Sequence, residues 1–120
     1  MIDWRRIDHV QVTIPSNAMD AAREFYGDVL GLTERDQPDS FGEGDTAWFR
    51  ADDVEIHLAV EPSRERSRRH PAFEVTDVAA ARAHLEAHDI ETVEEPKIPG
   101  RERFSFRDPF DNRIELLQRA

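Results

Sequence analysis

The chain has 120 residues, the length of one ordinary domain, and it contains no Cys, which excludes disulfides, thiolate nucleophiles and Cys-ligated metal sites. Asp and Glu outnumber Lys and Arg by 26 to 16, and the formal net charge of −10 argues against nucleic acids and anionic membranes as partners. No apolar run reaches the roughly 20 residues of a membrane-spanning helix, and the start, MIDWRR, lacks the apolar core of a signal peptide. We therefore expect a soluble, cytoplasmic protein.

The first half of the sequence predicts a strand, a helix and three further strands. Residues 8–14 alternate between apolar and polar side chains, which is typical of a half-buried strand. Residues 15–17, Pro-Ser-Asn, break the strand and offer a helix N-cap. Apolar residues at helical spacing over 18–30, followed by Gly31, predict a helix that ends at this glycine. Further strands are expected at 32–36, 46–51 and 54–60.

The second half predicts the same order of elements. A strand at 70–75 leads to a helix at 78–88, with Thr76 or Asp77 as its N-cap. The polar stretch 61–69 carries no period and is expected to be a linker. Strands at 91–95, 103–107 and 113–118 close this half, with DPFDN as the turn before the last strand.

The two halves are also similar in sequence. Three pairs of segments match in the same order: HVQVTIPS at 9–16 with HPAFEVTD at 70–77, AAR at 21–23 with AAR at 80–82, and FRADDVEIHL at 49–58 with FRDPFDNRIEL at 106–116. The sequence therefore predicts an α+β fold of paired βαβββ modules, at 1–60 and 70–120, which form a curved mixed sheet with helices on its outer face.

Four possible metal ligands occupy the strand faces opposite the apolar ones. Repeat alignment makes His9 equivalent to His70, and His57 equivalent to Glu115. A single His on a strand is commonly structural, but four such residues at equivalent positions favour a site. Imidazole and carboxylate groups bind Zn, Ni, Mn, Co and Fe(II), so the sequence predicts a divalent metal ion, of unassigned identity, on these four residues.

Two further groups of side chains carry weaker signals. His84 and His88 lie four apart on a predicted helix, and we interpret them as exposed helix residues. A basic run has two interpretations, a solvated linker or an anion-attracting rim beside His70; it consists of Arg64, Arg66, Arg68 and Arg69.

Candidate substrate-binding residues lie on the later strands of each module. If the two Phe of strand 103–107 lie under the helices, Arg103 and Arg107 face the metal cavity beside Arg50, the repeat partner of Arg107, and form a carboxylate clamp. The reverse orientation would give an aromatic wall. Trp48 is a candidate wall residue by the same logic, with a place in the core as the alternative.

The sequence as a whole resembles the vicinal oxygen chelate superfamily, which includes glyoxalases, methylmalonyl-CoA epimerases, extradiol dioxygenases, fosfomycin-modifying thiol transferases and bleomycin-binding proteins. The segments that carry this resemblance are DHVQVTIP, EFYGDVLGL, VEIHLAV, HPAFEVTD and FRDPFDNRIELL. The resemblance implies metal ligands at His9, His57, His70 and Glu115, which is the four-ligand pattern of the glyoxalases and epimerases. Glyoxalases usually carry a carboxylate where this chain has His57, which argues against isomerisation of a glutathione hemithioacetal.

The resemblance favours a metal-dependent lyase or isomerase acting on a small substrate with vicinal oxygens. The metal would chelate both oxygens and stabilise an enediolate, while Glu115 moves the proton as the catalytic residue. Two alternatives stay open. One is an extradiol-type dioxygenase with Fe(II) on His9, His70 and Glu115, and the other is a non-catalytic resistance protein that sequesters a ligand in the same cleft.

We also expect a homodimer with two metal sites. Each module presents an open polar sheet face and strand edges that need covering. The nine-residue linker spans up to roughly 30 Å, so the modules can close on each other within one chain or on the modules of a second chain. The resemblance favours metal sites shared between two chains.

Overall fold

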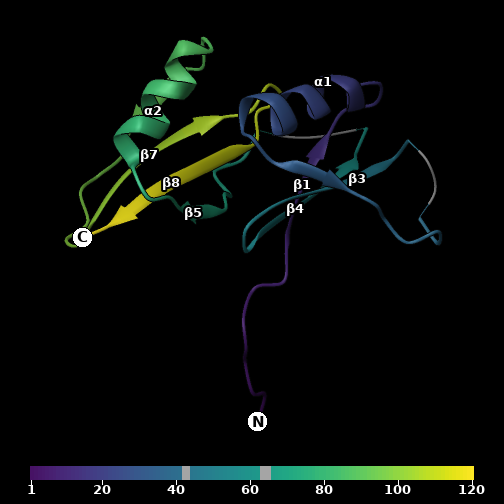
Figure 1. Cartoon of the computed structure of the whole chain (residues 1–120), viewed down its shortest axis with the longest axis horizontal. Helices are drawn as coiled ribbons and strands as arrows, with labels where there is room; N and C mark the ends of the chain where they lie inside the picture. The colour runs from purple at the N-terminus through teal and green to yellow at the C-terminus, as the bar shows by residue number, and fades with distance from the viewer. Residues whose placement is uncertain (42–43, 63–65) are drawn as a thin grey trace. The chain divides into compact units, whose positions relative to one another are not determined.

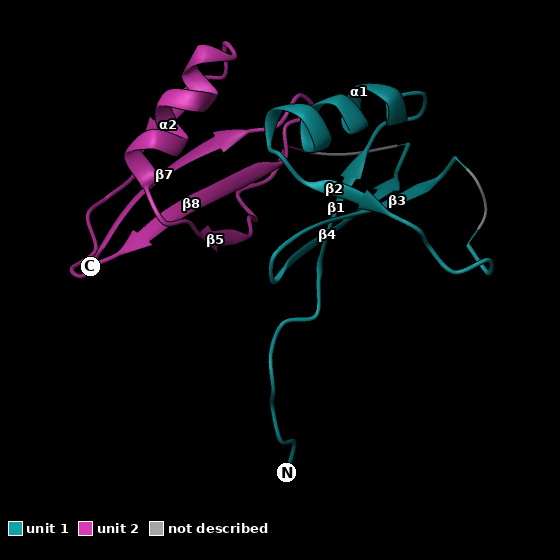
Figure 2. Cartoon of the chain, in the orientation of Figure 1, with its two compact units in different colours: residues 1–62 teal, residues 63–120 magenta. Residues whose placement is uncertain are grey.

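The computed structural model describes residues 1–41, 44–62 and 66–120, and it divides the chain into two compact units (Figure 2). The units are Met1–Pro62 and Ser63–Ala120. Each holds a βαβββ order of elements and its own mixed four-stranded sheet, which confirms the predicted α+β class.

The first unit has its strands in the order β1-β4-β3-β2, with β1 parallel to β4 and the other neighbours antiparallel (Figure 1). Its elements are β1 (Val10–Ile14), α1 (Met19–Arg23), the π-helix η1 (Glu24–Val29), β2 (Thr33–Arg35), β3 (Thr46–Ala51) and β4 (Val54–Val60).

The core of the first unit lies between the helical segment and one face of this sheet. Tyr26 is fully buried, with its ring centroid 6.2 Å from that of Phe49 on β3. The two-residue period of the strands places the other apolar side chains of this face beneath the same segment. The buried sheet residues are Val12, Ile14, Ala47, Phe49, Ile56 and Leu58.

The start and middle of the first helix differ from the sequence prediction. Its N-cap is Ala18, with no side-chain cap, so the predicted capping by residues 15–17 is wrong. Asn17 has a φ of 65°, and the Ala18 N–H donates to the carbonyl of Pro15, so a backbone turn precedes the helix instead. The second half is a π-helix rather than an α-helix. Gly31, with a φ of 78°, follows the end of this segment, as predicted.

The second unit has its strands in the order β5-β8-β7-β6, with β5 parallel to β8. Asp77 is the N-cap of its helix and accepts a hydrogen bond from the Ala80 N–H at 3.0 Å, which selects one of the two predicted caps. Its elements are β5 (Ala72–Glu74), α2 (Val78–Ala87), β6 (Thr92–Glu94), β7 (Arg101–Arg107) and β8 (Arg113–Arg119).

The DPFDN segment between β7 and β8 forms the predicted turn around one buried carboxylate. Asp108 Oδ1 accepts hydrogen bonds from the backbone N–H groups of Phe110 and Asn112, at 2.9 and 2.8 Å. Its Oδ2 accepts from the Asn112 side-chain amide at 2.8 Å. These bonds satisfy the buried Asp and fix the register in which β8 returns beside β7.

No helix in the described ranges is long and apolar enough to cross a membrane. The cytoplasmic location stays a prediction.

Candidate metal centre

The sheet face of the first unit that points away from α1 carries a stack of three rings. His57 on β4 lies in register with Trp48 on β3, and the two rings are nearly parallel, with centroids 4.2 Å apart and an interplanar angle of 2°. His9, one residue before β1, stacks on His57 with centroids 3.9 Å apart and an angle of 17°. The face assigned to both histidines from the sequence is therefore correct.

A carboxylate and a guanidinium hold this stack. Glu55 Oε2 accepts a hydrogen bond from His57 Nε2 at 2.9 Å, and Oε1 accepts one from Arg35 Nη1 at 2.6 Å. The Arg35 guanidinium also lies over the Trp48 ring, 5.8 Å from its centroid. The hydrogen bond from His57, and then that from Arg35, holds the pKa of Glu55 below its usual range. His57, buried among these groups, is thus fixed in both position and orientation.

His9 is held differently. Its Nδ1 donates to Asp8 Oδ2 at 2.8 Å, and this hydrogen bond lowers the pKa of the Asp8 carboxyl. The ring is more exposed than that of His57, with 39% of the side chain accessible. With Nδ1 engaged, Nε2 is the ring nitrogen that remains to bind a ligand.

The second unit brings its two predicted ligands together. His70 Nε2 lies 3.3 Å from Glu115 Oε1, and His70 Nδ1 donates to the carbonyl of Arg68 at 2.9 Å. Two donor atoms on one divalent ion, each at about 2.0–2.2 Å, lie roughly 3.0–3.4 Å apart, so this pair fits a metal ion. Arg103 Nη1 also donates to Glu115 Oε1, at 2.9 Å, and it neutralises the buried carboxylate.

His9 and His70, which the repeat makes equivalent, therefore have the same local arrangement. Each donates a hydrogen bond from Nδ1 to an oxygen acceptor and directs Nε2 away from it, in His70 toward Glu115 Oε1, which is how metal-ligating histidines are usually oriented. Each unit contributes one half of the predicted ligand set. Within the described residues, no three side chains of the His, Cys, Asp and Glu types already surround one point. The four-residue site stays a prediction.

This fold, with histidines on or just before its strands, points to a known family. The family model described as Glyoxalase/Bleomycin resistance protein/Dioxygenase superfamily matches residues 6–116. The chain belongs to this superfamily.

Individual relatives support this assignment. A glyoxalase family protein of Bacillus anthracis is 34% identical, with a TM-score of 0.91 and full coverage of both chains. The protein YaeR of Escherichia coli K12 is 30% identical over 98% of this chain and 99% of its own. The fosfomycin resistance protein FosX of Listeria monocytogenes, solved with Mn(II) and sulfate, shares the fold at 18% identity and a TM-score of 0.76, over 100% of this chain and 93% of its own.

The orientation of β7 in this glyoxalase-like fold resolves one of the open alternatives. Phe104 and Phe106 are buried on the helix side of their sheet, and the Arg82 guanidinium lies 5.6 Å from the Phe104 ring centroid. Arg103 and Arg107 therefore point to the opposite face, the one that carries Glu115. The aromatic-wall alternative for this strand is wrong.

The other candidate substrate-binding residues lie on the sheet faces that the prediction requires. Trp48 is half-buried on the open face with His57, not in the core. Arg50 is exposed, and its Nε donates to a backbone carbonyl of its own hairpin turn at 3.2 Å. Arg107 makes the equivalent contact through Nη1 at 2.7 Å. Their predicted roles toward a substrate stay predictions.

Three residues on the open faces were missed by the sequence reasoning. Glu95 accepts hydrogen bonds from Ser105 Oγ at 2.6 Å and from Arg113 Nη2 at 2.7 Å, and these two contacts, Ser105 first, lower its pKa. Glu55 lies two residues before His57 on one strand, so the two-residue period could have found it. Arg35 and Glu95 carried no such signal, because their contacts depend on strand pairing.

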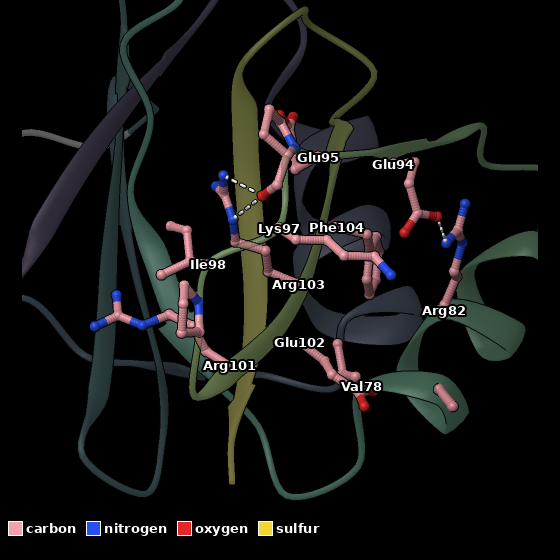
Figure 3. A pocket seen from close by; sticks show the side chains of 13 residues that line it. Val78, Arg82, Glu94, Glu95, Lys97, Ile98, Arg101, Glu102, Arg103 and Phe104 are labelled. Atoms are coloured by element: carbon pink, nitrogen blue, oxygen red, sulfur yellow. Dashed lines mark hydrogen bonds and ion pairs between the residues drawn. The ribbon is translucent and has the colours of Figure 1, made fainter.

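A cavity of about 600 Å³ lies elsewhere in the second unit (Figure 3). Its lining combines residues from the helix side of the sheet, such as Val78 and Phe104, with Glu95 and Arg103, which contact the face that carries Glu115. Figure 3 shows Arg103 at its edge, where Nε and Nη2 donate to the carbonyl of Pro96 at 3.2 and 2.8 Å. Other lining residues are Val78, Arg82, Lys97, Ile98 and Phe104.

The remaining histidines and arginines that were singled out from the sequence lie on the surface where the structure describes them. His84 on α2 and His88 at its C-cap are exposed, as expected, with ring centroids 4.5 Å apart. Of the basic run, Arg64 lies outside the described residues, while Arg66, Arg68 and Arg69 are exposed. Both interpretations of this run stay open.

Proposed function

We propose that this protein is a metal-dependent lyase or isomerase that acts on a small substrate with two neighbouring oxygens. The observation that carries the proposal is the His70–Glu115 pair, whose donor atoms are separated by a distance suited to one ion. The equivalent orientation of His9 supports it. The Mn(II) bound by FosX, which has the same fold, makes a divalent ion the natural cofactor.

The sequence predicts His9, His57, His70 and Glu115 as ligands, of which His9, His70 and Glu115 form the core of the proposed site, and Zn, Ni, Mn, Co and Fe(II) all accept such groups. A bound ion would supply Lewis-acid polarisation of the substrate oxygens and make the adjacent C–H bond more acidic.

The chain's own residues would hold the substrate and move its proton. Glu115 Oε1 is engaged by His70 and Arg103, so Oε2 is the oxygen that would take a proton from the substrate and return it. Arg103, Arg107 and Arg50 would bind a substrate carboxylate, and Trp48 would form an apolar wall beside it.

Metal analysis tests the proposal first. Protein purified without an affinity tag or chelator should contain close to one divalent ion per chain, measured by elemental mass spectrometry. His70→Ala should lose most of it, because removing one ligand also disorders the others, and His88→Ala, at the exposed C-cap of α2, should keep it. Wild-type protein without metal would contradict the proposal and favour a non-catalytic binding protein.

Activity assays then separate the reaction classes. A lyase or isomerase should exchange solvent deuterium into 2-oxo or thioester substrates. An extradiol-type dioxygenase, the second enzyme candidate, would instead consume oxygen with a catechol and require Fe(II). The observation favouring that candidate is that His57 is engaged by Glu55, which leaves His9, His70 and Glu115 as a three-ligand set.

We also propose a homodimer. Light scattering at micromolar concentration should give twice the chain mass of 13.9 kDa, in high as well as low salt, and the monomer mass would refute it. Mixing a His9→Ala chain with a Glu115→Ala chain tests where the site is built. Partial recovery of metal binding indicates sites shared between chains, and no recovery indicates that each chain builds its own.

A further inference from the structure

We infer that His57 is a positioning residue for His9, and not the fourth metal ligand that its place in the repeat predicts. This inference rests on the proposed function, because it takes His9 to be a ligand. It concerns contacts within the first unit only, and the stack of His9, His57 and Trp48 carries it.

The ring nitrogens give the first argument. His9 and His70 engage Nδ1 with an oxygen acceptor and leave Nε2. His57 does the opposite, since its Nε2 donates to Glu55 at 2.9 Å. Coordination through Nε2 would break this bond and leave the half-buried Glu55 carboxylate with only its contact to Arg35.

The ring planes give the second argument. The lone pair of an imidazole nitrogen lies in the plane of its ring, so two histidines that bind one ion must have planes that meet at that ion. The His9 and His57 planes differ by only 17°, with centroids 3.9 Å apart. Nearly parallel planes at this separation do not meet at a point about 2.1 Å from a nitrogen of each ring. The arrangement suits stacking and not shared coordination.

The surroundings of His57 give the third argument. Trp48 lies parallel to it, at 4.2 Å and 2°, and Glu55 and Arg35 join the two residues from the side. Rotating His57 toward an ion would break the stacking and the hydrogen bond together. Left in place, its face supports the His9 ring, which is otherwise held only by the exposed Asp8 among the described side chains.

The test is titration of the metal-free protein with Co²⁺, followed by calorimetry and by visible absorption. His57→Phe keeps a flat ring at this position but no nitrogen, so its Co²⁺ affinity should stay within about threefold of wild type, with an unchanged absorption spectrum. His57→Ala removes the supporting face and should weaken binding about 10-fold, in the range seen when groups that orient a ligand are removed. His9→Ala should lose binding altogether.

A His57→Phe variant that folds but loses Co²⁺ as completely as His9→Ala would overturn the inference, since it would make the nitrogen of His57 a ligand. A thermal melt of each variant shows whether it is folded. If wild-type protein itself binds no Co²⁺, the proposed function fails and this inference fails with it, which is a different result from the loss confined to His57→Phe.

Nitrogen NMR of the histidine rings decides the point even if His57→Phe does not fold. In wild-type protein without metal, His57 should carry its proton on Nε2, while His9 and His70 carry theirs on Nδ1. Addition of Zn²⁺ should move the Nε2 signals of His9 and His70 and leave both nitrogens of His57 nearly unchanged. A metal-bound shift at either His57 nitrogen would overturn the inference.

Discussion

Removing the Arg103 guanidinium should tighten metal binding, although it removes three hydrogen bonds from the metal-free protein. Its Nη1 lies 2.9 Å from the Glu115 oxygen that is predicted to meet the ion. An ion about 2 Å from that oxygen would then lie roughly 4 to 5 Å from the guanidinium charge. At an effective dielectric of about 20, two unit charges at this separation repel by roughly 3–4 kcal/mol, and a divalent ion and a guanidinium by about twice that before water screens them.

Two effects oppose this gain in affinity. Glu115 would lose a partner that orients it, and fixing one such side chain costs about 0.5–1.5 kcal/mol. Water would also enter beside the carboxylate and screen its charge. The repulsion remains the larger effect, because both side chains are mostly buried, with 14% and 7% accessible. Arg103→Met should therefore bind Zn²⁺ more tightly by about 1–2 kcal/mol, which is roughly 5- to 30-fold.

A competition titration with a coloured chelator measures this affinity in the metal-free protein. Arg101→Met is the matched control, since Arg101 lies two residues earlier on the same face of β7 and makes no described contact with Glu115. The control should change Zn²⁺ affinity by less than about 0.5 kcal/mol, because the half-buried Arg101 lies farther from the predicted ion and its charge is screened by water. Equal or weaker binding by Arg103→Met would show that the guanidinium orients Glu115 more than it competes with the ion.

Three further predictions concern stability. Glu95→Gln should lower the free energy of unfolding in urea by about 1–3 kcal/mol, because Arg113 loses its charged partner, and a change under 0.5 kcal/mol would contradict the geometry. The carboxyls of Glu55 and Glu95 have lowered pKa values, so their stabilising effect is complete above the ordinary value of about 4.3 and is lost as the pH falls through their lowered values. Thermal melts between pH 3 and 7 should show this loss below about pH 4.3, less steeply in Glu95→Gln; an equally steep loss in that variant would exclude Glu95 as a cause. Asp77→Ala should cost about 1 kcal/mol, while Asp77→Ser, which keeps a cap, should cost less; equal losses would argue against capping.

The strands could be predicted from the sequence because two signals indicate them: the alternation of apolar and polar residues, and the internal repeat. The ranges 46–51 and 54–60 agree with β3 and β4 residue for residue. The π-helix was not predictable, since its hydrogen bonds, such as that from the Leu30 N–H to the Phe25 carbonyl, skip one residue more than an α-helix does. Apolar spacing over a single turn does not distinguish these two patterns.

The face that carries each predicted ligand was also predictable, because side chains on a strand alternate with a strict period of two. The contacts that each predicted ligand makes could not be predicted from the sequence. The contacts that hold His57 in place depend on Arg35 and Trp48. These residues lie on other strands and are brought beside His57 only by the register of strand pairing. The choice of ring nitrogen depends on single hydrogen bonds of this kind, such as that from His57 to Glu55.

The strand pairing gives the two equivalent positions, His57 and Glu115, different neighbours. The residue opposite His57 on β3 is Trp48, and the residue opposite Glu115 on β7 is Ser105. The indole covers the imidazole face and keeps the ring in the stack. The small Ser105 leaves space beside the carboxylate, where Arg103 from the same strand reaches it. The bulky Trp48 thus suits a position where His57 acts as a supporting ring. The small Ser105 suits a position where Glu115 can exchange its contact with the Arg103 guanidinium for a contact with an ion. By this reasoning, we expect the cross-strand neighbour to determine which of the two equivalent positions binds the ion and which supports a ligand.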